Sequence, residues 1–329
     1  MEAALRLAEA HGFVGTILRA RINLGGTFWW RDPRVALATS HPGLVVARRF
    51  GRRSEGIILL SNAALASIRL GDWDWAESEL EAARMADLER ADLAIVYQTL
   101  VALRAYRGAD PSEMLASLEA LLVDDTDPQN RADLRRAQAS VAIAAGELRR
   151  AFDLSMEAAT VSWVNGPAPV AWAGHAATWA GDAARVREAL DRHVASAQHG
   201  PALELERATM RAVLAGMAGR RSEAVTLFRD VFRGWRDLGC RFDFALAALD
   251  AVSVLGRGDA EIDAAAAEAR ETLVGLRAEP FIARLDAAGR GGPPPAGSPG
   301  RSPERETADV QAAVYRFTPT SNPPSGAGS

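Results

Sequence analysis

The 329-residue chain contains no lysine, because all 38 of its Lys and Arg residues are arginine. This absence excludes mechanisms that need a lysine side chain, such as P-loop phosphate binding, Schiff-base catalysis and the phosphate contact of protein kinases. The one cysteine, Cys240, cannot form an intramolecular disulfide and suits a reducing compartment, so we expect a cytoplasmic protein. No nucleophile motif surrounds Cys240, and we interpret it as a small buried apolar residue.

The chain also lacks a basic excess and a clear membrane-spanning segment. Its net charge of −4 offers no general attraction to a phosphate backbone. The longest stretch without charged residues, 158–181, contains prolines and glycines, and a turn followed by a buried helix explains it better than a span. We therefore expect a soluble protein with neither nucleic acid nor membrane as a direct partner.

Catalytic patterns are missing as well. No two histidines are three or four residues apart, and neither a Gly-x-Ser-x-Gly nor a Gly-x-Gly-x-x-Gly motif occurs. Asp124, Asp125 and Asp127 form a cluster, but they precede Pro128 in a turn, where such residues cap helices. The sequence therefore predicts no catalytic residue, no metal site and no cofactor.

What the chain has in abundance is alanine, with 67 residues, and this composition favours helix. Glycines end Ala/Leu-rich runs at a nearly fixed interval, with successive steps of 37, 38, 35, 38 and 37 residues. These six glycines are Gly71, Gly108, Gly146, Gly181, Gly219 and Gly256. Such a period is typical of solenoids, whose repeats bury their apolar faces only by stacking. We predict an all-α superhelix of about seven helix hairpins over residues 1–288.

The turn within each period has a consistent chemistry. Glycine suits the end of the first helix, where a positive φ is usually needed. The Asp or Glu that often follows can cap the next helix and interact favourably with its dipole. Elsewhere, we expect Trp29 to fill a gap between helices and Pro33 to open one.

One of these turns, Gly71-Asp72-Trp73-Asp74-Trp75-Ala76, resembles the Gly-x-aromatic-x-x-Ala turn of tetratricopeptide repeats. Weaker forms run from Gly146 to Ala151 and from Gly219 to Ala224. The resemblance implies that the small residues let paired helices approach closely while the aromatic fills the space beside them. It assigns this packing role to Gly71, Trp73, Ala76, Gly146, Ala151, Gly219 and Ala224.

The period is longer than the usual 34 residues, and most repeats lack the family's proline. Longer, degenerate repeats of this kind look like the C-terminal region of bacterial AAA-type ATPase regulators with a cyclase domain, or of regulators with a LuxR-type DNA-binding domain. Residues 238–286 look especially like the end of such chains. The resemblance implies a role in signal transduction, as a stand-alone or truncated form of that region.

Two groups of residues are candidates for partner binding. Trp172, His175 and Trp179 share one helix face and could form an aromatic patch for a peptide or planar ligand, or could pack between neighbouring hairpins. Aligning Gly71 with the family's turn glycine places Asn62 where relatives often grip a peptide, with Arg69 nearby. The adjacent repeats do not complete such a carboxylate clamp.

The two ends differ from the repeats. Residues 1–11 read as the second helix of a hairpin whose first helix is absent, so the apolar face around Leu5 and Ala8 needs a cover. That cover could be a lost upstream domain, a partner or self-association, or the short helix could simply fray. Residues 289–329, with 20 Pro, Gly or Ser among 41, are predicted to be a disordered tail. Residues 310–317 within it could be a docking motif or merely scattered apolar residues.

The sequence thus favours a non-enzymatic scaffold that holds a protein or peptide on the concave face formed by the first helices. The alternative is a detached sensory region of an ATPase, cyclase or transcription regulator. A third hypothesis, small-ligand chemistry around Trp172 and His175, lacks a visible set of acid, base and nucleophile.

Overall fold

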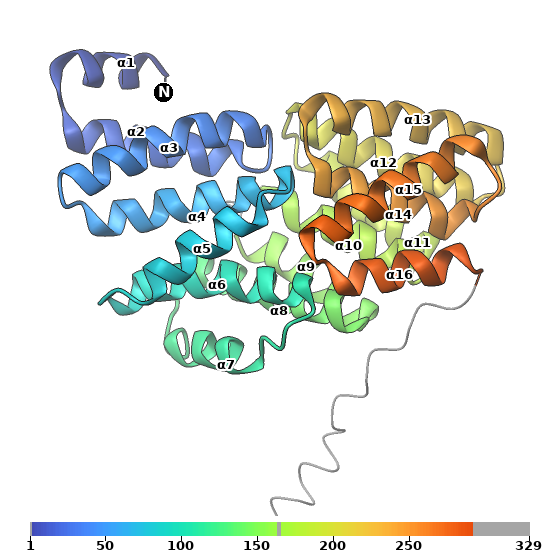
Figure 1. Cartoon of the computed structure of the whole chain (residues 1–329). Helices are drawn as coiled ribbons and strands as arrows, with labels where there is room; N and C mark the ends of the chain where they lie inside the picture. The colour runs from blue at the N-terminus through green and yellow to red at the C-terminus, as the bar shows by residue number, and fades with distance from the viewer. Residues whose placement is uncertain (1, 163–165, 292–329) are drawn as a thin grey trace, which may run out of the picture. The chain divides into compact units, whose positions relative to one another are not determined.

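The computed structural model describes residues 2–162 and 166–291, and within them every regular element is an α-helix (Figure 1). The all-α class predicted from composition and period is confirmed. Residues 292–329, which hold most of the expected tail and its 310–317 segment, lie outside the described residues. The helices are α1 (Glu2–His11), α2 (Val14–Phe28), α3 (Pro33–Arg49), α4 (Arg53–Leu70), α5 (Trp73–Arg84), α6 (Arg90–Arg107), α7 (Ser112–Leu121), α8 (Pro128–Ala145), α9 (Leu148–Val161), α10 (Ala168–Trp179), α11 (Ala183–Ala195), α12 (Pro201–Met217), α13 (Arg221–Leu238), α14 (Arg241–Leu255), α15 (Ala260–Leu276) and α16 (Glu279–Gly289).

Each sequence period corresponds to one helix pair. From α4 onward, an even-numbered helix is followed by a short turn and an odd-numbered helix that packs against it. The even-numbered helices also pack on one another in succession, α4 on α6, α6 on α8 and α12 on α14. At the N-terminal end, α1 packs on α2 and buries Ala8, whereas Leu7 stays exposed.

The periodic glycines supply the turns between paired helices. All six have positive φ, from 68° at Gly256 to 80° at Gly71. A residue with a side chain pays a steric penalty in this left-handed region, which explains the recurrence of glycine. The turn is a local property, and the sequence shows it directly.

Capping at these turns is less regular than the pattern suggested. Asp182 accepts a hydrogen bond from the Arg185 amide at 3.1 Å, as expected of a cap. Asp72 and Glu147 make no side-chain cap hydrogen bond, so that expectation is wrong at these two turns. Three other capping sites form among the described helices, at Asp127 before α8, at Asp259 before α15 and at Asp32 before Pro33, which opens α3.

The residues assigned to repeat packing lie at the helix contacts. Ala76, Ala151 and Ala224 are fully buried, as is Trp73, whose indole N–H donates to the Ile68 carbonyl at 2.9 Å. Cys240 is buried too, and burial raises the pKa of its thiol, in keeping with a small apolar role. None of the described helices combines the length and apolar character needed to cross a membrane.

The even-numbered helices form an inner layer that closes on itself. Many residues on all sides of α4, α6, α10 and α14 are buried, whereas α5 and α7 bury only one face. The reason is that α14 packs against α4 and α10, while α16 packs against α6 and α8. The inner face of the first hairpins is therefore covered by the last ones.

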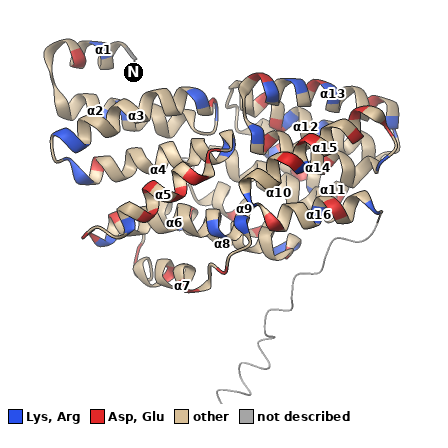
Figure 2. Cartoon of the chain, in the orientation of Figure 1, with Lys and Arg blue, Asp and Glu red and all other residues tan. Residues whose placement is uncertain are grey.

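The outer layer is charged and mixed in sign (Figure 2). Several arginines pair with a carboxylate about one repeat away, as in Arg229–Glu261 at 3.0 Å and Arg236–Glu268 at 2.6 Å. Exposed pairs of this kind contribute about 0–1 kcal/mol each, so the buried inner layer has the larger share in holding the stack together.

A matched pair of glycine variants tests the packing of the turns. Replacing Gly71 or Gly181 with alanine places a side chain at positive φ, which costs about 1–2 kcal/mol in each case. At Gly71 the new Cβ would also lie 3.2 Å from Arg241 Nε, whereas at Gly181 it meets nothing within 4 Å. We expect Gly71→Ala to lower the free energy of unfolding more, measured by urea denaturation. Equal losses would contradict the close approach of α14 to this turn.

Candidate functional site

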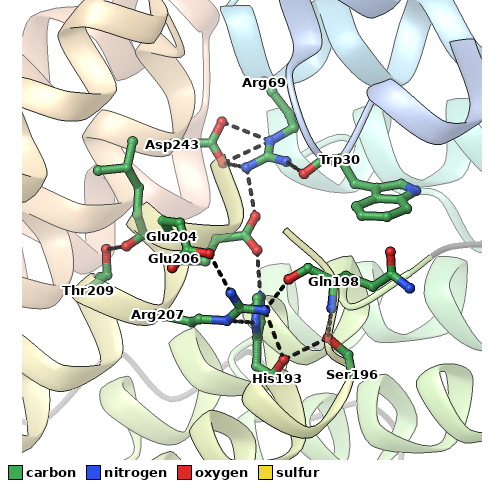
Figure 3. A network of polar contacts seen from close by, with 11 residues as sticks. Trp30, Arg69, His193, Ser196, Gln198, Glu204, Glu206, Arg207, Thr209 and Asp243 are labelled. Atoms are coloured by element: carbon green, nitrogen blue, oxygen red, sulfur yellow. Dashed lines mark hydrogen bonds and ion pairs between the residues drawn. The ribbon is translucent and has the colours of Figure 1, made fainter. Parts of the chain in front are cut away.

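A buried arginine joins the two ends of the inner layer. Arg69, on α4, extends toward α12 and α14 and contacts two carboxylates (Figure 3). Its Nη2 donates to Glu206 Oε1 at 2.7 Å and to Asp243 Oδ1 at 2.9 Å, and its Nε to both Asp243 oxygens at 3.1 Å. Nη1 donates to the Trp30 carbonyl at 3.1 Å. Each of the three guanidinium nitrogens is thus engaged, by segments up to 174 residues away.

Glu206 extends this network into the next pair of helices. Its Oε2 lies 2.8 Å from Nε2 of His193, which is completely buried. The other ring nitrogen, Nδ1, accepts from Arg207 Nε at 3.0 Å, so Nε2 carries the proton that Glu206 accepts. Arg207 also donates to the Gln198 and His193 carbonyls, and these bonds tie the α11–α12 connection to the network (Figure 3).

Burial and ion pairing shift the pKa values of these groups in opposite directions. Burial alone would raise the pKa of Glu206, but Arg69 and His193 outweigh it and lower that pKa, so Glu206 is ionised at neutral pH. For Asp243, burial dominates and raises the pKa despite Arg69. Arg69 stays charged, because the two carboxylates more than offset its own burial and raise its pKa. We call Arg69, Glu206 and Asp243 the buried latch.

Beside the latch lies an aromatic cluster built from four helices. Trp172 stacks on Tyr106 with ring centres 5.1 Å apart, and both contact Phe242 and Phe281. The hydroxyl oxygens of Tyr106 and Ser140 lie 2.9 Å apart. The cluster therefore fills the space between the first and last hairpins, where an external ligand was one of the two expectations for Trp172.

His175 lies on the same helix face and has an acidic partner. Its Nδ1 is 2.7 Å from Asp250 Oδ2 on α14. Burial pushes the pKa of His175 down, but the Asp250 carboxylate, with Asp243 and Glu206 behind it, outweighs burial and raises the pKa. Burial raises the pKa of Asp250 itself. The pair therefore favours a protonated His175.

Trp179 and Arg284 form a contact that sequence reasoning missed. The guanidinium carbon of Arg284, on α16, lies 4.9 Å from the centre of the Trp179 ring. Within the described part of the chain, no carboxylate lies within ion-pair distance of Arg284, which donates to the Ile143 carbonyl at 3.4 Å. Burial lowers the pKa of Arg284 to about 10. The aromatic ring thus stands where an anion would otherwise be expected.

Asn62 is separate from this group. Its side-chain amide donates to the Ile22 carbonyl at 3.1 Å and packs beside Gly25, joining α4 to α2. The structure brings Arg69, Trp172, His175 and Trp179 into one interior region. Asn62 lies outside it, at the contact between α4 and α2. In the described chain all five make internal contacts, and their part in partner binding stays a prediction.

A cavity of about 70 Å³ lies among these groups, with Trp29, Tyr106, Trp172, His175 and Asp243 in its wall. Pockets for small molecules usually measure about 300–1,000 Å³, and a water molecule takes about 30 Å³. In this arrangement the cavity therefore has space for about two waters, whereas a larger ligand requires the helices to move. No group of three metal-ligating side chains is found among the described residues.

The partners of Arg69 and His175 carry no local signal in the sequence. Glu206, Asp243 and Asp250 lie in helices whose composition resembles that of their neighbours, 75 to 174 residues away from the groups they contact. A scan against protein-family models and a search of curated proteins both give no match.

Removing the charge of Arg69 tests the buried latch. Arg69→Met leaves Glu206 and Asp243 buried without their cation, which is expected to cost about 3–5 kcal/mol of folding stability. The triple variant Arg69→Met/Glu206→Gln/Asp243→Asn removes the stranded charges and should recover most of that loss. The measurement is urea denaturation followed by circular dichroism. A single variant no less stable than the triple one would contradict this account.

His175 gives a prediction for pH. A pKa raised by folding means that the folded chain binds more protons than the unfolded chain, so its contribution is present below about pH 6.5 and is lost as pH rises through the folded-state pKa. We expect the stability of His175→Gln to fall less than that of the wild type between pH 6 and pH 9. His199→Gln is the matched control, since that side chain is 80% exposed. Parallel curves for all three proteins would argue against the pair.

Proposed function

We propose that this chain is a non-enzymatic interaction module that holds a protein partner and serves as a regulatory scaffold in signal transduction. We further propose that it acts in the cytoplasm without a cofactor and without direct contact to nucleic acid or membrane. The stacked helix pairs and their Gly-x-aromatic-x-x-Ala turn support a tetratricopeptide-like class, because such stacks present long ridged surfaces to proteins.

The observation that carries the proposal is an open groove of about 430 Å³ between α3, α4 and α5, which we call the α3–α5 groove. It is lined by apolar residues of three helices, among them Leu44, Ile57 and Leu60, and has arginines at its edge. Its volume is in the range of sites that take side chains or small molecules, whereas the interior cavity is several times smaller. A second hollow, along α9, is lined mainly by charged residues of one helix.

This location differs from the concave face on which a partner was first expected. The inner helices α4, α6, α8 and α10 are covered by α14 and α16, so Arg69 and Trp172 can reach a partner only if the last hairpins move away. The exposed groove needs no such movement. We therefore place the resting contact with a partner on the α3–α5 groove.

The buried latch favours a second candidate, a sensory region of an ATPase, cyclase or transcription regulator. A regulated module needs two arrangements of similar free energy, and a junction held by ion pairs is sensitive to ligands and to charge. Opening at this junction would expose the aromatic cluster and the inner helices. In that case the closed form is one of two states.

Site-directed photo-cross-linking tests the proposal. A photoreactive amino acid is placed at exposed apolar positions, Met85 beside the groove and Val123, Val194 and Val274 elsewhere. We expect a cross-linked species of constant mass at Met85 after irradiation of cells that express the full chain. Unirradiated cells are the control, and no light-dependent product at any of the four positions would refute the proposal.

The same experiment addresses the second candidate. With the triple latch variant as background, a regulatory closure predicts a changed yield at Met85 or a new product. An unchanged pattern at all four positions would count against a sensory role and leave the scaffold proposal in place.

A further inference from the structure

The α3–α5 groove exists because small residues line it where larger ones would close it. α3 and α5 both pack against α4. Leu44 of α3 and Ile57 and Leu60 of α4 form the floor of the groove. Gly56 and Ala83 face the space between, and neither has a side chain that could cross it. The result is a trough with an apolar floor, open to solvent and formed by three helices.

The edge of the groove is positively charged. Residues 48–53 contain four arginines and no acidic residue, and the turn between α3 and α4 is mostly blue in Figure 2. Arg48 pairs with Glu79 across the groove, and Arg52 pairs with Glu55. In the described structure no carboxylate lies within ion-pair distance of Arg49 or Arg53. Two of the four arginines therefore have no ion-pair partner in the described structure.

Apolar side chains also gather at this edge. Phe50 is 51% exposed and Met85 is 76% exposed. A hydrogen bond from Arg53 Nη1 to the Asp87 carbonyl, 3.0 Å long, holds the segment after α5 beside the start of α4 and so keeps Met85 close. The α3–α5 groove and its edge thus combine an apolar floor, flanking apolar side chains and a basic rim.

We infer that the α3–α5 groove binds an acidic amphipathic helix of a partner protein. Apolar side chains at helical spacing would occupy the floor, while carboxylates on the flank that faces the turn between α3 and α4 would meet Arg48, Arg49, Arg52 and Arg53. Contacts to a phosphate backbone are polar and do not require an apolar floor, so this surface suits a protein partner better than a nucleic acid. This inference rests on the proposed function and names the partner's chemistry.

Fluorescence anisotropy with synthetic 16-residue peptides tests the inference on the full chain. The probe has leucines at positions 2, 5, 9 and 12 and otherwise Glu and Ala. One comparison peptide carries Arg in place of Glu, and another has the same composition in scrambled order. We expect the acidic amphipathic peptide to bind at least tenfold more tightly than either, with affinity falling as salt is raised.

Two variants of the chain separate charge from shape. Arg48→Glu/Arg52→Glu removes the net positive charge of residues 48–53, and Ala83→Trp fills the trough without changing its charge. Each should weaken binding at least tenfold. The matched control is Arg233→Glu/Arg270→Glu, which changes the same charge at arginines that are 64% and 51% exposed on α13 and α15, and it should bind as the wild type does. Circular dichroism checks that every variant folds.

Several outcomes would overturn the inference. These are equal binding of the scrambled peptide, equal loss in the control variant, or unchanged binding by Ala83→Trp. Tighter binding of a duplex DNA, lost in the rim variant, would assign the surface to nucleic acid instead. If the peptide does not bind but a partner is photo-cross-linked at another position, the inference is wrong and the proposed function stands. If the peptide does not bind and no position gives a cross-linked product, both the inference and the proposed function are wrong.

Discussion

The ion pairs of Arg69 are the constraint on which the closed arrangement depends. A guanidinium buried this deeply needs hydrogen-bond acceptors and a compensating charge, since an unpaired buried ion costs several kcal/mol. The groups that meet these needs come from α12, α14 and the turn after α2, so the cation requires three remote segments to converge. Once they do, α14 lies across α4 and α10 and covers the inner face of the first hairpins.

The repeat architecture could be predicted from sequence because it is encoded locally. Helix propensity and the positive φ of a turn are properties of a few consecutive residues, so Gly71 and Gly146 indicate the helix pairs directly. Caps at Asp72 and Glu147 failed because capping depends on small differences in backbone geometry at the helix start. Closure of the inner layer was not predictable, because Asp243 carries no periodic signal that relates it to Arg69.

The candidate site shows why residue chemistry alone does not distinguish a ligand contact from an internal one. Trp172 and His175 were selected as groups suited to bind something, and both are engaged, Trp172 by Tyr106 and His175 by Asp250. The polar and aromatic features that recognise a ligand are the same ones that join remote helices in a layered stack. Only the long-range contacts decide between these uses, and a single sequence does not contain them.

Charge balance then separates the interior from the surface. Inside, Glu206 and Asp243 compensate Arg69, and an aromatic ring lies against Arg284, since an uncompensated buried charge is costly. On the surface, water tolerates unbalanced charge, so Arg49 and Arg53 persist without carboxylate partners in the described structure at little cost to folding. Stability does not explain why such charge gathers beside an apolar trough with Phe50 and Met85 exposed. Contact with a complementary surface explains both features at once.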